Sequence, residues 1–128
     1  MENKNLEKML SDIITIVGIP THVKGYKYLR DSISHLVGDM SLASSITKTL
    51  YPLVAKENQT SASRVEKAIR NAINIGYNAG KMPNLNEFFG IKIFDKYDKP
   101  TNGEFITFIA DRMILNLSLI HISEPTRH

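Results

Sequence analysis

The most informative part of the sequence is TSASRVEKAIRN, residues 60–71. Apolar and basic residues recur there at helical spacing, which predicts a helix with one apolar side and one basic side. The apolar side carries Val65, Ala68, Ile69, Ala72 and Ile73, and the basic side carries Arg64, Lys67 and Arg70. A short helix with a basic outer face fits the major groove of DNA, which is wide enough to admit one helix.

A second predicted helix precedes this one, from about residue 45 to residue 56, with Ile46, Leu50, Leu53 and Val54 as its apolar stripe. Pro52 lies inside it and lacks an N–H, so we expect this helix to kink or to restart there. The polar residues 57–60 predict a tight turn, and Thr60 or Ser61 can cap the following helix. That helix should continue to about Asn78 and stop at Gly80. Residues 45–81 therefore predict a helix-turn-helix.

The rest of the chain also predicts helices, so the expected fold class is all-α with about six helices. The other four are expected at about residues 6–17, 24–37, 84–89 and from Thr101 or Asn102 onward. Residues 91–94 favour a brief extended segment. We assign residues 1–116 to a single helix-turn-helix domain.

Residues 117–128 differ from the preceding domain because their apolar residues lose the helical rhythm. The run SLIHISEPTR, residues 118–127, looks like a translated cloning adaptor, so we predict a non-native or disordered tail. A genuine helix end with a frayed tail is the alternative.

Composition indicates a globular protein without a membrane span. Hydrophobic residues make up 42% and charged residues 23% of the 128 residues, and no apolar run approaches the ~20 residues that cross a bilayer. The polar N-terminus does not resemble a signal peptide, and the absence of cysteine excludes disulfides and thiolate chemistry. These features are compatible with a cytoplasmic location, which we expect.

The positive charge is concentrated in the predicted helix-turn-helix. Residues 45–81 carry six Lys or Arg against two Glu, a formal charge of +4, whereas the remainder carries ten basic and eleven acidic residues. Concentrated positive charge attracts phosphate and makes binding depend on salt. A solvated helix that simply carries lysines is the alternative interpretation.

No arrangement of residues typical of an enzyme is found. The four histidines, His22, His35, His121 and His128, lack the spacing of metal ligands, and the glycines form no phosphate-binding loop. Asp12, Asp31, Asp39 and Asp111 fall on separate predicted elements rather than forming an acid–base pair. We therefore expect no enzymatic activity, no metal and no cofactor.

In a helix-turn-helix the second helix presents its first residues to the base edges. Arginine can donate twice to guanine, asparagine can pair with adenine, and glutamate can accept from cytosine. The predicted base-reading residues are Arg64, Glu66, Lys67, Arg70 and Asn71. The predicted phosphate contacts, which position without reading sequence, are Lys48, Lys56, Ser61, Ser63 and Lys81. The alternative function is a protein-interaction module that uses Leu85, Phe88 and Phe89.

Four blocks of sequence resemble a known family. They are VGIPTHVKGYKYLR (residues 17–30), SITKTLYP (45–52), SRVEKAIR (63–70) and KPTNGEFI (99–106). In order and without large gaps, they resemble the effector domain of the master sporulation response regulator of endospore-forming bacteria, over about residues 13–115. The resemblance implies six helices with a helix-turn-helix, and a two-component transcription factor that activates and represses genes at the start of sporulation.

The resemblance also implies partners and roles. Members bind operators with a TGTCGAA-like core, often as tandem dimers, and contact sigma subunits of RNA polymerase. It places base reading at residues 64–71 and dimer contacts in the final helix. It places the polymerase contact within residues 77–89, where the candidates are Tyr77, Leu85, Glu87 and Phe88.

Two residues of the predicted reading helix depart from the family pattern. Lys67 stands where well-known members have arginine, and Asn71 stands where they have histidine. Lysine keeps the charge but loses the two-pronged donor, so Lys67 is expected to shift toward phosphate contact, and Asn71 toward adenine. The receiver domain of the family has no counterpart in these residues, so we expect DNA binding without phosphorylation control. The altered final helix makes dimer formation an open question.

Overall fold

The computed structural model describes residues 2–122 and is helical, with no strand in that range. The elements are α1 (Glu2–Ile16), α2 (Lys24–Gly38), a 3-10 helix η1 (Met40–Ser45), a π-helix η2 (Ile46–Leu50), α3 (Tyr51–Glu57), α4 (Ala62–Asn78), α5 (Asn84–Phe89) and α6 (Asn102–Ile122). The all-α prediction with six α-helices is confirmed over the described residues. None of these helices combines the length and the apolar character that a membrane span requires.

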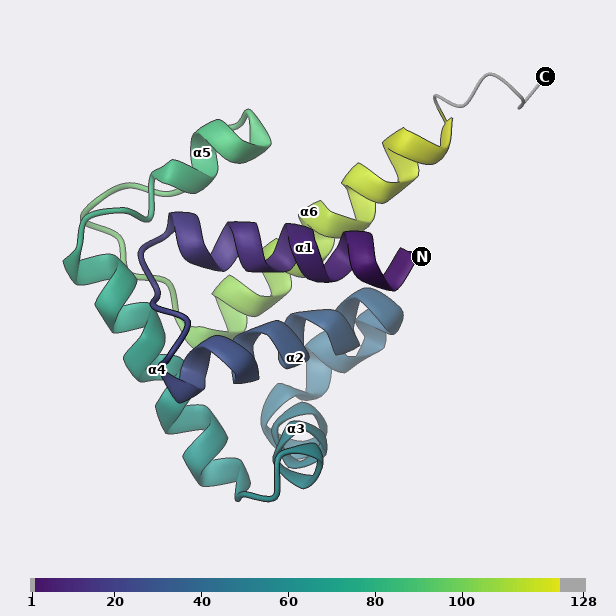
Figure 1. The fold of residues 1–128 in the computed structure, drawn as a ribbon, viewed down its shortest axis with the longest axis vertical. Helices are drawn as coiled ribbons and strands as arrows, with labels where there is room; N and C mark the ends of the chain where they lie inside the picture. Colours follow the sequence, from purple (N-terminus) through teal and green to yellow (C-terminus); the bar gives the residue numbers. More distant parts are fainter. Residues whose placement is uncertain (1, 123–128) are drawn as a thin grey trace.

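Helix α2 lies in the middle of the molecule and packs against α1, α3, α4 and α6 (Figure 1). Its stripe of Leu29, Ile33 and Leu36 has helical spacing and is fully buried. Phe105 and Ile109 of α6 are also fully buried. The core therefore joins the N-terminal helices to α6 and gives α4 a fixed support.

The helix-turn-helix begins later than the periodicity predicted. Residues 40–50 form the 3-10 helix and the π-helix, and the α-helical pattern starts at Tyr51, with Pro52 in its first turn. A proline in the first turn costs no hydrogen bond, because the N–H groups there have no partner within the helix. The expected restart at Pro52 is thus confirmed.

The turn between α3 and α4 is short and polar, as predicted. Asn58 ends α3, and Gln59 takes a left-handed conformation with φ of 56° that reverses the chain direction. Figure 1 shows α3 and the start of α4 meeting at one end of the molecule, with α5 at the other end.

The segment of residues 91–101, which we call the 91–101 segment, has no regular structure. The extended segment expected at residues 91–94 does not pair as a strand. Instead, the Asn86 side chain accepts hydrogen bonds from the N–H groups of Ile93 and Phe94 at 2.9 Å and donates to Phe94 O at 2.6 Å. Helix α6 then starts with a capping box, because Thr101 Oγ1 accepts from Glu104 N and Glu104 Oε1 accepts from Thr101 N.

The tail prediction falls partly outside the described residues. Residues 117–122 continue α6 to Ile122, and residues 123–128 lie beyond the part of the chain that the structure describes.

Candidate nucleic-acid interface

The first turn of α4 is fixed by its cap. Ser61 takes an extended conformation, and its hydroxyl accepts a hydrogen bond from Arg64 N at 3.2 Å. Ser61 was one of two predicted caps, and its side chain satisfies one N–H that the helix leaves unpaired. Ser61 is exposed. Because its hydroxyl already caps the helix, that hydroxyl is less free to bind a phosphate.

Helix α4 has a fully buried face and a polar outer face. Val65, Ile69 and Ala72 are completely buried, and Ile73 and Gly76 continue that face. On the opposite side, the exposed residues are Ser63, Arg64, Lys67, Arg70 and Asn71. The structure therefore brings four of the five predicted base-reading residues to one exposed surface.

Glu66, the fifth predicted reader, lies at the side of this surface. Its Oε2 accepts from Arg70 Nη1 at 2.7 Å, and its side chain is 33% exposed against 55% for Arg70. Its backbone oxygen accepts from Asn102 Nδ2 at 3.1 Å. Glu66 thus orients the Arg70 guanidinium, whose remaining N–H groups are available to a base edge.

Tyr51 lies behind this pair, at the start of α3, and is 4% exposed. Burial raises the pKa of the Tyr51 hydroxyl above its ordinary value of 10.0, while a hydrogen bond with the Asn102 side chain opposes that shift. The charges of Glu66 and Arg70 also reach the hydroxyl, with opposite effects on its pKa. Tyr51 and Asn102 therefore link the flank of α4 to α3 and α6.

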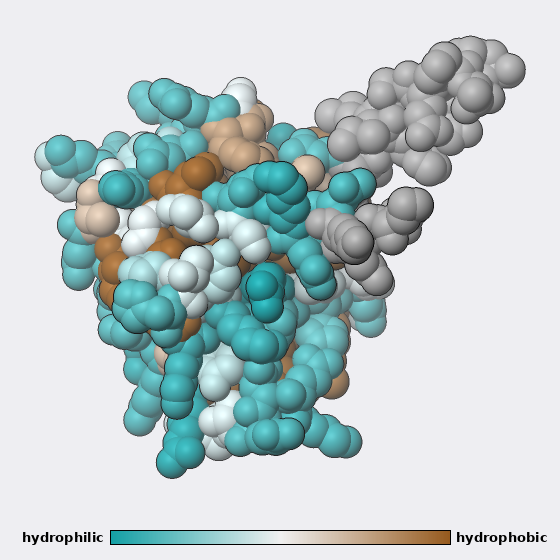
Figure 2. All heavy atoms as spheres, viewed as in Figure 1, coloured by the Kyte–Doolittle hydropathy of each residue, from teal (hydrophilic) through white to brown (hydrophobic). Residues whose placement is uncertain are grey.

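The predicted phosphate contacts do not form one group. Lys56 in the last turn of α3, and Ser61 and Ser63 at the start of α4, are exposed near the turn, whereas Lys48 is exposed in η2, before α3 begins. Lys81 follows the other end of α4, which is about 25 Å away at 1.5 Å per residue. Figure 2 shows mostly hydrophilic residues over the end of the molecule that carries α3 and the start of α4.

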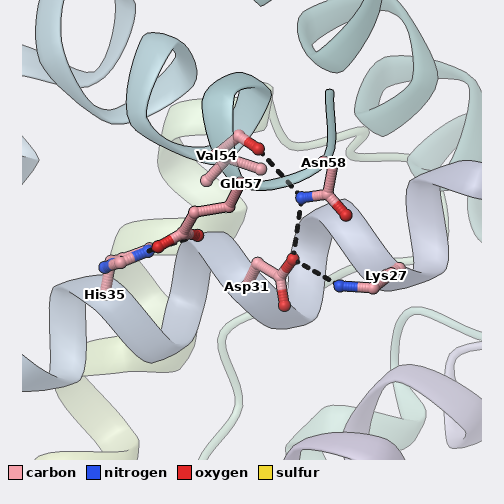
Figure 3. A network of polar contacts seen from close by, with 6 residues as sticks. All are labelled: Lys27, Asp31, His35, Val54, Glu57 and Asn58. Carbon is pink, nitrogen blue, oxygen red and sulfur yellow. Dashed lines mark hydrogen bonds and ion pairs between the residues drawn. The ribbon is translucent and has the colours of Figure 1, made fainter. Parts of the chain in front are cut away.

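A network of polar side chains fixes the turn to α2 (Figure 3). Asn58 Nδ2 donates to Asp31 Oδ2 at 3.0 Å and to Val54 O at 2.9 Å, and Asp31 also accepts from Lys27 at 2.9 Å. His35 Nε2 lies 2.8 Å and 3.0 Å from the two Glu57 carboxylate oxygens. No local sequence pattern predicts this network, because Asn58 and Asp31 are 27 residues apart, and His35 and Glu57 are 22 residues apart. The network holds α3 and the turn in one orientation relative to the core.

The predicted polymerase-contact residues are not all accessible. Glu87 is exposed and Phe88 is 39% exposed, but Leu85 is completely buried and Phe89 is partly buried. Leu85 is therefore wrong as a contact residue, because it is the apolar anchor of the short helix α5. Tyr77 is partly buried, and its hydroxyl donates to Tyr97 O at 3.1 Å.

Two residues near the outer face of α4 were missed by the sequence analysis. Lys99, in the 91–101 segment, donates from Nζ to Asn74 Oδ1 at 2.8 Å. No local pattern predicts this contact, because 25 residues separate the two side chains.

In the described part of the chain, no group of three or more His, Asp or Glu could hold a metal ion.

Comparison with known families gives a match that covers most of the chain. The model of the family described as "Sporulation initiation factor Spo0A C terminal" matches residues 10–113. The matched region contains α2 to α5 completely, together with about the second half of α1 and the first half of α6.

Proposed function

The chain belongs to the family of Spo0A C-terminal domains, and we propose that it reads operator sequence by placing the first three turns of α4 in the major groove. The family is one of DNA-binding domains of sporulation transcription factors, not of enzymes. The observation that supports the proposed mode of reading is the outer face of α4. Arg64, Lys67, Arg70 and Asn71 are all exposed there and lie within the first three turns of the helix.

Each reading residue has a proposed role. Arg70, oriented by Glu66, donates to guanine, and Asn71 pairs with adenine. Arg64 and Lys67 also face the groove, where Lys67 acts as a point charge toward base or phosphate. Glu66 has its carboxylate engaged by Arg70, so its contribution is to hold that arginine in the reading position.

Phosphate contacts position the helix. Lys56, Ser61 and Ser63 lie beside the turn and Lys48 lies before α3, and we assign all four to the DNA backbone. Lys81, at the far end of α4, reaches a different part of the duplex. The proposed operator has a TGTCGAA-like core.

We assign the protein contacts to other surfaces. Tyr77, Glu87 and Phe88 form the proposed contact with a sigma subunit, with Phe88 as the exposed apolar residue. A second copy on adjacent DNA is proposed to pair through α6, where Leu115 is 40% exposed. Glu87 and Phe88 lie on α5 and Leu115 lies on α6, so these contacts leave the first turns of α4 to the DNA, whereas Tyr77 lies near the far end of α4 itself.

Fluorescence anisotropy tests the reading mode, with a duplex that carries the TGTCGAA-like core and a scrambled duplex across a salt series. The parent protein should bind the operator more tightly, with an affinity that falls steeply as salt increases. Arg70→Ala should reduce operator discrimination by about 1–3 kcal/mol, and Lys56→Ala should weaken binding to both duplexes equally.

Lys8→Ala is the charge-matched control, because Lys8 is exposed on α1 and pairs only with Asp12 among the described residues. It should leave affinity and salt dependence unchanged. Unchanged discrimination in Arg70→Ala would refute the assigned reading face. Equal binding of both duplexes by the parent would leave only a basic surface, and no DNA binding would favour a protein-interaction module that uses Phe88.

A further inference from the structure

Lys99 is a basic residue that the fold brings to the recognition helix from outside the helix-turn-helix. It is exposed, and its Nζ lies 2.8 Å from Asn74 Oδ1 on α4. Among the described residues, Lys99 forms no ion pair. Because its partner is a neutral amide, the full positive charge of Lys99 remains available to an anion.

The surrounding segment is anchored on both sides of Lys99. On one side, Phe94 is buried, and the Tyr97 carbonyl accepts from the Tyr77 hydroxyl of α4 at 3.1 Å. On the other side, Thr101 is held in the capping box at the start of α6. Lys99 is therefore held close to α4, at a fixed position along the helix axis.

This position along the axis of α4 places Lys99 just beyond the proposed base-reading residues. Asn74 follows Lys67 by seven residues, which rotates the position by only about −20° and moves it about 10.5 Å along the axis. Asn74 follows Asn71 by about 4.5 Å. Since the major groove is about 12 Å wide, a helix that enters by its first three turns brings its fourth turn to the groove edge, where the phosphates lie.

Two carboxylates lie in the same hollow as Lys99, namely Asp98 and Glu104. Glu104 is already engaged, because it accepts the hydrogen bond from Thr101 N at 3.0 Å. Asp98 is exposed and opposes an approaching phosphate. The proposed phosphate contact therefore depends on the Lys99 ammonium lying away from Asp98. The hydrogen bond to Asn74 directs it toward α4.

We propose that Lys99 is a phosphate-binding residue, which adds a DNA contact from the 91–101 segment to those of the helix-turn-helix. The inference rests on the proposed function, because it assumes that α4 enters the major groove. Lys99 then positions the protein on the DNA backbone and does not read bases. Lys99 should thus contribute equally to operator and non-operator DNA.

The test compares Lys99→Gln with Lys96→Gln by fluorescence anisotropy, using the operator and scrambled duplexes across a salt series. Lys96 is the matched control, because it is exposed in the same segment and lies over the Tyr97 ring, 5.5 Å from its centroid. Lys99→Gln should lower the salt slope by about 1 and weaken binding roughly eightfold at 0.1 M salt on both duplexes. Lys96→Gln should match the parent, and Lys99→Arg should restore most of the affinity.

The outcomes separate this inference from the function on which it rests. If the parent prefers the operator but Lys99→Gln keeps the parental salt slope, the phosphate contact is wrong and the proposed function stands. If Lys99→Gln weakens the operator selectively, Lys99 reads sequence and the positioning role is overturned. If the parent shows no operator preference, the proposed function fails, and the slope change still decides whether Lys99 contacts phosphate. Equal thermal unfolding of all variants ensures that the comparison concerns binding.

Discussion

The first half of α4 packs against another helix, whereas its last turns are held by irregular segments. At the first half, Gly25 of α2 approaches so closely that a Cβ atom there would lie 2.2 Å from Ala68 O. At the last turns, Asn74 and Tyr77 bond to Lys99 and to the Tyr97 carbonyl of the 91–101 segment. The reading end is thus supported by a tightly packed helix pair. The far end is supported by the 91–101 segment, in which Phe94 is the one buried residue, and by the loop after α1, where a Cβ at Gly76 would lie 2.5 Å from Val17 O.

The contrast suggests that the two ends differ in local stability. Regions with few buried apolar contacts open more easily than packed helices. A rigid first half suits base reading, which depends on geometry, while a phosphate contact tolerates a less rigid support. Substitutions at each end test this comparison.

The largest effect is expected at the contact between α2 and α4. Gly25→Ala would place its Cβ 2.2 Å from Ala68 O and 2.6 Å from the Ala72 Cβ, so the two helices must separate. Overpacking of this kind typically costs 1–3 kcal/mol, and because a backbone oxygen cannot rotate away, we expect about 3 kcal/mol. Urea unfolding measures the loss.

Gly38→Ala is the matched control, because it lies in the last turn of the same helix and a Cβ there meets nothing within 4 Å. It should be neutral or slightly stabilising, since alanine is the better helix former. A loss below about 1 kcal/mol in Gly25→Ala would show that the helix pair adjusts easily and that the first half of α4 is not rigidly held.

Much of the fold could be predicted from local patterns. The Ser61 cap, the end of α4 at Asn78 and the bounds of α5 follow from capping residues, glycines and apolar spacing, which act over a few positions. The 3-10 and π-helical turns of residues 40–50 could not be predicted, because the apolar spacing of that region also fits an α-helix. Tertiary packing selects among these alternatives.

The candidate site was less predictable than the fold. The exposed basic face of α4 follows from its periodicity, but the partners of its residues do not. Asn102 donates a hydrogen bond to Glu66 from 36 residues away, and Lys99 donates one to Asn74 from 25 residues away. Only the path of the folded chain brings these residues together. Leu85 was misassigned because a six-residue helix has too few positions for its buried side to be recognised.

An intermediate effect is expected at the support of the 91–101 segment. Asn86→Ala removes three hydrogen bonds to Ile93 and Phe94, which should cost about 2 kcal/mol locally. Hydrogen–deuterium exchange should show faster exchange at residues 93–100 and unchanged protection at Val65 to Ile73 of α4. Equal loss of protection in both regions would mean that the two ends of α4 unfold as one unit, and the comparison would fail.

The smallest effect is expected at the network that fixes the turn to α2. Asn58→Ala removes the hydrogen bonds to Asp31 Oδ2 and Val54 O, which should cost about 1 kcal/mol in urea unfolding. Asn78→Ala, at the exposed end of α4, is the control and should change stability by less than about 0.5 kcal/mol.

A double-mutant cycle with Asp31→Ala separates the side-chain bond from the bond to Val54. A coupling of about 0.5 kcal/mol or more would assign part of the turn's stability to the link between Asn58 and Asp31. No coupling would mean that Asn58 acts only within α3. The tight packing of Gly25 against Ala68 and the contact between His35 and Glu57 would then join α2 to the helix-turn-helix without the bond between Asn58 and Asp31.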